Sequence, residues 1–362
     1  WMRGVATDAV IVGGSDNLNY GTGSFVGGGS VNSNYGEHGV VVGGKGNLLF
    51  GDYAFIGGGR SNVCNYYGGL DGVIGGGRGN IVEGDSAAVL GGENNNARSD
   101  GTVIGGGGQN YANGFYAFVG GGYRNNITNG VDYSVIAGGN RNLIGGGYNE
   151  DCFIGGGSYN VIDGPHGGMI GGGRHNTIYS GVDGVIGGGK YNTNWSSTCG
   201  FIGGGQGNRV EGDYAMIVGG RTNSAAGDCS FAAGNVAHAD HDGAFVWSDM
   251  SSGTPFRSVT NDEVAIRAVN GVRIAENAGD TKVVEIGRRY RDNSVIAWAR
   301  VVADGTLSES YGIESASKLD TGEYQLVLMD AAENTGSLVP VAVAELDSAP
   351  SSAANVRIVS VD

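Results

Sequence analysis

Two pairs of carboxylates are the residues of this sequence whose type and spacing could do catalytic chemistry. A pair of Asp or Glu side chains that flanks a glycosidic bond can hydrolyse it, one acting as acid and the other as base or nucleophile. The candidate pairs are Glu83 with Asp85 and Glu211 with Asp213. Both pairs lie in the same tetrapeptide, Val-Glu-Gly-Asp, at equivalent points of two copies of a repeat. We therefore interpret them as repeated turn residues.

The segment His238-Ala239-Asp240-His241-Asp242 holds side chains that can ligate a metal ion. Three chains around one axis would bring three copies of this segment together, but we interpret it as a solvated loop. The Gly-Lys-Ser or Gly-Lys-Thr of a phosphate-binding loop does not occur, and no nucleophile elbow accompanies the five histidines. The sequence thus predicts no catalytic residue, no metal and no cofactor.

A third group of candidate residues is basic and occupies a fixed place in a glycine-rich repeat. If successive copies stack, these residues form one basic stripe, which suits an acidic polysaccharide or a neighbouring chain. The alternative is that they keep a repetitive edge soluble or pair with Asp52, Asp85 and Asp213. Eight of the eleven basic residues before residue 244 belong to this group: Lys45, Arg60, Arg78, Arg124, Arg141, Arg174, Lys190 and Arg221.

The repeat that positions these residues is Gly-Gly-Gly-Xaa-Xaa-Asn, with two glycines in some copies. Each copy also holds an apolar run that ends in glycine and a second, shorter segment after the asparagine. Fifteen or sixteen residues accommodate two short strands and two tight turns, so the unit is one coil of a parallel β-roll. About 14 coils are marked by Asn17, Asn32, Asn47, Asn62, Asn80, Asn95, Asn110, Asn125, Asn142, Asn160, Asn176, Asn192, Asn208 and Asn223.

The recurring asparagine and glycines have separate structural roles. Stacked asparagines could form a ladder in which each amide hydrogen-bonds the next. The alternative is that asparagine merely tolerates a left-handed turn. Glycine permits positive φ at a corner and close approach of backbones, so we expect substitutions at the second or third glycine to be poorly tolerated.

Composition excludes several classes of protein. The chain has 75 glycines but only 4 prolines and no three-residue period, which excludes collagen. A formal net charge of -15 argues against a nucleic-acid partner. No apolar run approaches the roughly 20 residues that span a bilayer, so we expect no membrane insertion. The nine-residue period and recurrent aspartate of calcium rolls are absent.

Residues 10–237, with their Ile-Gly motifs and short period, resemble the head domains of trimeric autotransporter adhesins, the YadA-like β-roll. The resemblance implies a left-handed coil, a homotrimer and an extracellular location. Residues 243–274 resemble the collar that follows such rolls in phage tail-fibre and bacterial surface proteins. We therefore expect an all-β chain with a rod at 1–237 and a collar at 238–275.

The last part of the chain, 276–362, alternates apolar and polar residues in short runs such as 295–301, 324–328, 339–346 and 356–361. Turn signals at Asp304-Gly305 and Thr321-Gly322 separate these runs. The pattern predicts a small antiparallel β-sandwich, similar to the terminal domains of phage tail fibres.

These expectations favour a non-enzymatic extracellular fibre protein of the phage tail-fibre or adhesin type. Its function would be attachment to a cell surface or host receptor, through a surface polysaccharide or a protein receptor. Two alternatives remain. One is a structural subunit of an extracellular filament that assembles end to end, and the other is a capsule-degrading tailspike enzyme.

Overall fold

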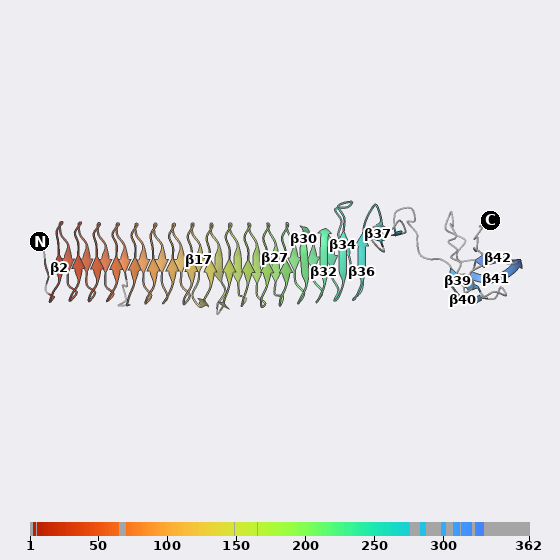
Figure 1. Cartoon of the computed structure of the whole chain (residues 1–362), viewed down its shortest axis with the longest axis horizontal. Coiled ribbons are helices and arrows are strands. Elements are labelled where there is room, and N and C mark those ends of the chain that lie inside the picture. The colour runs from red at the N-terminus through yellow and green to blue at the C-terminus, as the bar shows by residue number, and fades with distance from the viewer. Residues whose placement is uncertain are drawn as a thin grey trace, which may run out of the picture. The chain divides into compact units, whose positions relative to one another are not determined.

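The computed structural model describes residues 3–4, 6–64, 70–147, 149–164, 166–275, 283–286, 298–301, 307–311, 313–320 and 323–328. Within these residues there is no helix, and the strands wind into a parallel solenoid of about 17 turns (Figure 1). The all-β, glycine-rich parallel roll predicted from the sequence is therefore confirmed. Compact units are formed by residues 1–269 and 270–362.

Every coil of the roll contributes one short strand to each of two parallel sheets. Sheet 1 contains the strands that precede the glycines. It is open, because among the described strands β2 pairs only with β4 and β36 only with β34. Its strands are β2 (Val10–Ile11), β4 (Phe25–Val26), β6 (Val40–Val41), β8 (Phe55–Ile56), β10 (Val73–Ile74), β12 (Ala88–Val89), β14 (Val103–Ile104), β16 (Phe118–Val119), β19 (Val135–Ile136), β22 (Phe153–Ile154), β24 (Met169–Ile170), β26 (Val185–Ile186), β28 (Phe201–Ile202), β30 (Met216–Arg221), β32 (Phe231–Asn235), β34 (Phe245–Ser248) and β36 (Val264–Arg267).

Sheet 2 contains the strands that follow the asparagines. They are β1 (Arg3–Gly4), β3 (Leu18–Asn19), β5 (Ser33–Asn34), β7 (Leu48–Leu49), β9 (Val63–Cys64), β11 (Ile81–Val82), β13 (Asn96–Ala97), β15 (Tyr111–Ala112), β17 (Asn126–Ile127), β20 (Leu143–Gly145), β23 (Val161–Asp163), β25 (Thr177–Tyr179), β27 (Thr193–Trp195), β29 (Arg209–Val210), β31 (Ser224–Ala225), β33 (Ala237–Ala239) and β35 (Phe256–Arg257).

One irregular region accommodates the longer coils between Asn125 and Asn160. Here β18 (Val131–Asp132) pairs with β21 (Asn149–Glu150) as a separate two-stranded parallel ladder. The extra residues therefore leave the two main sheets in register, since Ile127 still pairs with Ile144.

The stack continues past residue 237, the predicted end of the rod. Strand β33 pairs with β31, and β34 and β36 extend sheet 1 to Arg267. The repeat signature is lost there because Ala237 occupies the place of the next asparagine, yet its backbone N–H still bonds Asn223 Oδ1 at 2.9 Å. Much of the expected collar is therefore rolled into the same solenoid.

The second unit contains antiparallel hairpins among its described residues. The pairs are β37 (Val272–Ala275) with β38 (Val283–Ile286), β39 (Trp298–Val301) with β40 (Leu307–Tyr311), and β41 (Ile313–Asp320) with β42 (Glu323–Leu328). The predicted runs at 339–346 and 356–361 lie outside the described residues. The sandwich remains a prediction.

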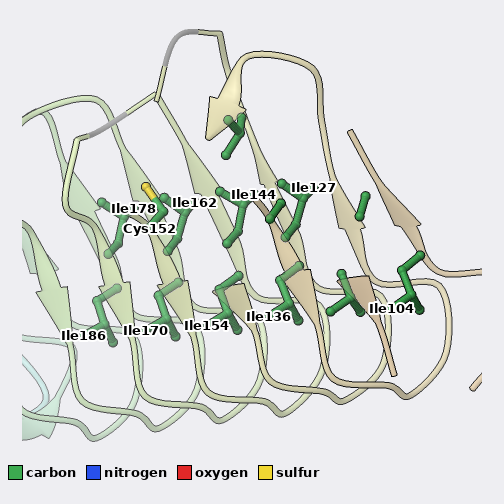
Figure 2. Packing of buried hydrophobic residues seen from close by; sticks show 14 of the residues in the cluster. Ile104, Ile127, Ile136, Ile144, Cys152, Ile154, Ile162, Ile170, Ile178 and Ile186 are labelled. Carbon is green, nitrogen blue, oxygen red and sulfur yellow. The ribbon is translucent and has the colours of Figure 1, made fainter. Parts of the chain in front are cut away.

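The core is a double column of aliphatic side chains between the two sheets. From β3 to β31, each two-residue strand of the two main sheets directs its second side chain inward, because successive strand residues point to opposite faces. Ile136, Ile154 and Ile170 from sheet 1 lie opposite Ile144 and Ile162 from sheet 2 (Figure 2), and all are fully buried. Burying one such side chain contributes about 1.5–3 kcal/mol, and the contribution recurs at every coil.

The asparagines form a continuous buried ladder between the coils. Asn142 Oδ1 accepts the backbone N–H of Asn160 at 3.0 Å, and the backbone N–H of Asn142 donates to Asn125 Oδ1 at 3.1 Å. Asn142 Nδ2 donates to the carbonyl oxygens of Gly138 at 2.9 Å and Gly157 at 3.2 Å. One amide thus satisfies backbone groups of its own coil and of the next coil.

We expect Asn142→Ala to lower the free energy of unfolding by about 2–4 kcal/mol, because it leaves buried backbone groups without partners. Asn140→Ala is the matched control, since Asn140 lies in the same coil and is exposed. Denaturation followed by circular dichroism measures both. Equal midpoints for the two variants would contradict a structural role for the amide.

The third glycine of the motif is held by the neighbouring coil. Gly77 has φ +93°, and a Cβ there would lie 2.1 Å from the carbonyl oxygen of Gly92. Gly76, the second glycine, has no heavy atom within 4 Å of such a Cβ. The expectation that the second glycine is also intolerant is therefore wrong at Gly76, because that position faces open space.

Gly77→Ala should destabilise the rod by about 1–3 kcal/mol through backbone strain and coil separation. Gly76→Ala should change stability by less than about 0.5 kcal/mol. Thermal denaturation of the two variants gives the comparison, and similar melting temperatures would refute this account of the motif.

Candidate binding surfaces of the rod

The two residues that precede each ladder asparagine form the edge at which sheet 1 turns into sheet 2, and we call this edge the corner. The first residue of each pair is bridged in parallel to its equivalent in the next coil, as in Lys45 with Arg60 and Arg174 with Lys190. The second residue adopts a left-handed conformation, with φ 56° at Arg124.

The eight basic residues therefore lie in two ranks rather than one. Lys45, Arg60, Arg78, Arg174, Lys190 and Arg221 occupy the first rank, whereas Arg124 and Arg141 occupy the second. The first rank is interrupted, because Glu93 follows Arg78 and forms an ion pair with it.

The corner between Tyr123 and Tyr191 combines cations with aromatic rings. The Arg124 guanidinium lies 5.1 Å from the centroid of the Tyr123 ring, and its Nε donates to Gln109 Oε1 at 2.6 Å. Arg141 lies 5.4 Å from the Tyr159 centroid and donates to its hydroxyl. These contacts fix side chains that would otherwise be mobile on an exposed edge.

A column of rings continues this surface toward the C-terminal end of the rod. His175 stacks between Tyr159 and Tyr191, with centroid distances of 4.9 and 5.0 Å. The Lys190 ammonium lies 4.7 Å from the Tyr191 centroid. Tyr191 is 47% exposed, so the column is accessible from solvent.

The paired carboxylates considered for catalysis each have a structural partner. Asp85 Oδ1 accepts the backbone N–H of Leu70 at 2.8 Å, and Asp213 Oδ1 accepts that of Thr198 at 2.7 Å. Asp52 accepts the backbone N–H of Glu37 in the same way. These aspartates tie successive coils together at the turn from sheet 2 to sheet 1, the opposite edge from the corner.

The two glutamates of the pairs contact arginines. Glu83 Oε2 lies 3.2 Å from Arg98 Nε, and Glu211 forms an ion pair with Arg209. Among the described residues, no ion pair joins a basic residue of the corner to Asp52, Asp85 or Asp213.

The segment 238–242 is built into the roll rather than into a separate loop. Asp240 Oδ2 accepts from Arg257 at 2.6 Å, and Asp242 Oδ1 accepts the backbone N–H of Asp228 at 2.9 Å. Burial lowers the pKa of His238. In the described part of the chain, no group of three or more His, Cys, Asp or Glu side chains is placed to hold a metal ion.

An apolar ridge that was not predicted from the sequence runs along the outer face of sheet 1. The first residue of every sheet 1 strand faces outward and is exposed or half-buried; Phe118 and Phe153 are 40% and 38% exposed. The signal was present, because a two-residue strand with two apolar residues must expose one of them. The ridge consists of Val10, Phe25, Val40, Phe55, Val73, Ala88, Val103, Phe118, Val135, Phe153, Met169, Val185, Phe201, Met216, Phe231, Phe245 and Val264.

Comparison with known proteins assigns no family to this chain. No protein-family model matches the chain, and a search of curated proteins found no similar sequence. Across the residues that the structure describes, no helix has the length and apolarity to cross a membrane.

The four cysteines should divide into two classes. Cys199 and Cys229 are exposed at equivalent turns two coils apart, whereas Cys64 and Cys152 are buried. Burial raises the pKa of Cys64 to about 12 and also raises that of Cys152. Since the thiolate is the reactive form, both buried thiols should be unreactive at neutral pH.

A thiol reagent at pH 8 should label Cys199 and Cys229 in the folded chain, and all four cysteines in denaturant. Mass spectrometry of peptides identifies the labelled positions. Rapid labelling of Cys64 or Cys152 in the native protein would contradict the core described above.

Proposed function

We propose that this chain is a non-enzymatic extracellular fibre protein in which parallel copies associate side by side into an attachment shaft. The observation that carries the proposal is the apolar ridge, which extends over all 17 strands of sheet 1. At about 4.8 Å per coil, it is roughly 80 Å long. Such a continuous apolar surface is characteristic of an interface.

The area of the ridge is sufficient for stable association. An aromatic side chain covers about 150–250 Å², so Phe118 at 40% exposure presents roughly 60–100 Å². Summed over the ridge, the apolar area is on the order of 1,000 Å², comparable to the roughly 800 Å² that each partner contributes to a typical interface.

The periodicity of the ridge indicates which partner can pack against it. Its side chains recur once per coil, so a partner can match them along the whole length only if its own side chains recur at the same step. A second copy of this chain, aligned in parallel, meets that requirement. Three copies with their ridges facing one axis would bury all of them, in agreement with the homotrimer that the resemblance implies.

Attachment follows from the same arrangement. A shaft made of stacked backbone layers provides stiffness and reach, while its corners and turns stay available to a cell surface or host receptor. The carboxylates considered for catalysis contact backbone N–H groups and arginines, which favours a binding role over polysaccharide hydrolysis.

Replacing two ridge phenylalanines that lie two coils apart, on either side of Val135, tests the association directly. Phe118→Glu combined with Phe153→Glu should convert the assembly to single chains, because each interface would then bury unpaired charges. Sedimentation velocity gives the number of chains per particle. Tyr116→Glu is the control, since Tyr116 is an aromatic of the same coil, 61% exposed at the opposite turn.

The proposal expects a three-chain particle for the wild type and for Tyr116→Glu. A wild-type chain that sediments as a monomer, or a ridge double variant that stays assembled, would refute it.

A further inference from the structure

We propose that the corner from Tyr123 to Tyr191 is a binding site for a linear anionic polysaccharide that lies along the rod. The proposal rests on the attachment function and names its ligand. The first observation is charge segregation. From Gly108 to Thr222 the corner holds five basic residues and no acidic one, although the chain carries a net charge of -15. A local cationic surface on an acidic rod attracts anions to one edge only.

The second observation is that the side chains are already ordered. Tyr159, His175 and Tyr191 stack with interplanar angles of 13° and 19°, and Arg141 and Lys190 lie against the rings at either end of this stack. Ordering flexible side chains usually opposes binding, because each one loses conformational entropy. At this corner, folding of the chain already orders these side chains, so ligand binding loses less conformational entropy.

The third observation concerns which atoms face the ligand. Because Tyr159, His175 and Tyr191 stack along the rod, the faces between them are covered, and the ring edges with the Tyr hydroxyls remain as hydrogen-bonding groups. Arginine and lysine add donors at neighbouring coils. This array repeats at the coil step, so it suits a polymer whose hydroxyl and carboxylate groups also repeat along a line.

Nucleic acid fits this surface less well. Single-stranded nucleic acid is bound by stacking bases on free aromatic faces, and the faces between Tyr159, His175 and Tyr191 are occupied by the neighbouring rings. The charge density also differs. Four basic residues, Arg124, Arg141, Arg174 and Lys190, span five coils, or roughly 19 Å. A nucleic-acid strand carries one phosphate per 3.4 Å or so, whereas a polymer of sugar acids is more sparsely charged.

The rest of the corner provides a matched control. Lys45 and Arg60 are bridged neighbours in the first rank, as are Arg174 and Lys190. The second-rank residues beside them are Gly46 and Ser61, so no ring orders this pair. The two pairs therefore allow the same charge reversal inside and outside the proposed site.

The experiment uses the full chain and alginate, a linear polymer of uronic acids, with neutral dextran as the second ligand. Isothermal titration at low salt should show binding to alginate and none to dextran. Arg174→Glu with Lys190→Glu should weaken alginate binding about tenfold or more, through lost charge-assisted hydrogen bonds. Lys45→Glu with Arg60→Glu should change it less than about twofold, the reduction expected from long-range charge alone.

A conservative substitution separates a specific site from general attraction. Tyr159→Phe keeps the ring stack but removes one hydroxyl and the exposed hydrogen bond that it accepts from Arg141, and it should weaken alginate binding about threefold with little change in stability. The proposal is overturned if the wild type does not bind alginate, if both charge-reversal pairs lose affinity equally, or if an oligothymidine of similar length displaces alginate at equal concentration.

Sedimentation velocity of the same samples distinguishes failure of the polysaccharide site from failure of the three-chain shaft. A three-chain particle that fails to bind alginate would refute the polysaccharide site and leave the shaft intact, with a protein receptor as the remaining ligand class. A single chain that binds alginate would refute the shaft alone.

Discussion

The structure depends on one constraint: each coil is hydrogen-bonded to the next in register. Each residue therefore lies next to the residue at the equivalent position of the neighbouring coil. The asparagine ladder enforces this constraint from inside, since Asn142 joins the backbone of its own coil to the coils on either side. The same register makes the isoleucine core continuous, forces Gly77 against the carbonyl of Gly92 and aligns the outward-facing side chains into ranks. Surfaces of this rod are therefore linear and repetitive.

The stacking of similar side chains at equivalent positions of successive coils has different consequences for apolar, aromatic and charged residues. Apolar residues gain from it, and aromatic rings at the corner stack favourably. Aspartates at the opposite turn are placed above one another, as with Asp213 and Asp228, where Asp228 Oδ1 accepts the backbone N–H of Asp213 at 2.9 Å. This hydrogen bond offsets part of the repulsion between like charges. In the first rank of the corner, Glu93 follows Arg78 and forms an ion pair with it, which places an opposite charge where a further basic residue would be repelled.

Much of the fold could be predicted from the sequence because a single residue type, asparagine, recurs once in each coil and so marks the period of the repeat. The spacing of the asparagines determined the coil length, and the apolar runs before the glycines located sheet 1. The prediction ended the rod too early because Ala237 keeps the backbone hydrogen bond without the side chain that marks it. Backbone register persists through β36, and a residue pattern alone does not reveal that.

The candidate surfaces were harder to predict than the coils. Lys45 and Arg124 both precede an asparagine, but a left-handed φ at the second position sends the two side chains into separate ranks. The spacing already distinguishes them, since Lys45 lies two residues before Asn47 and Arg124 one residue before Asn125, but it does not show that the two positions direct their side chains differently. The ridge, in contrast, could have been found from pairs such as Phe153-Ile154, because one member of each pair must face solvent or a partner.

Register itself can be measured with two spin labels in the first rank of the corner. Lys45 and Arg221 are joined by eleven successive bridges, so their separation along the rod is about 53 Å. Cysteines at these two positions, with Cys199 and Cys229 changed to serine, allow an electron–electron distance measurement in samples diluted with unlabelled chain. A narrow distribution near this distance agrees with one coil per asparagine. A broad or much shorter distribution would contradict it.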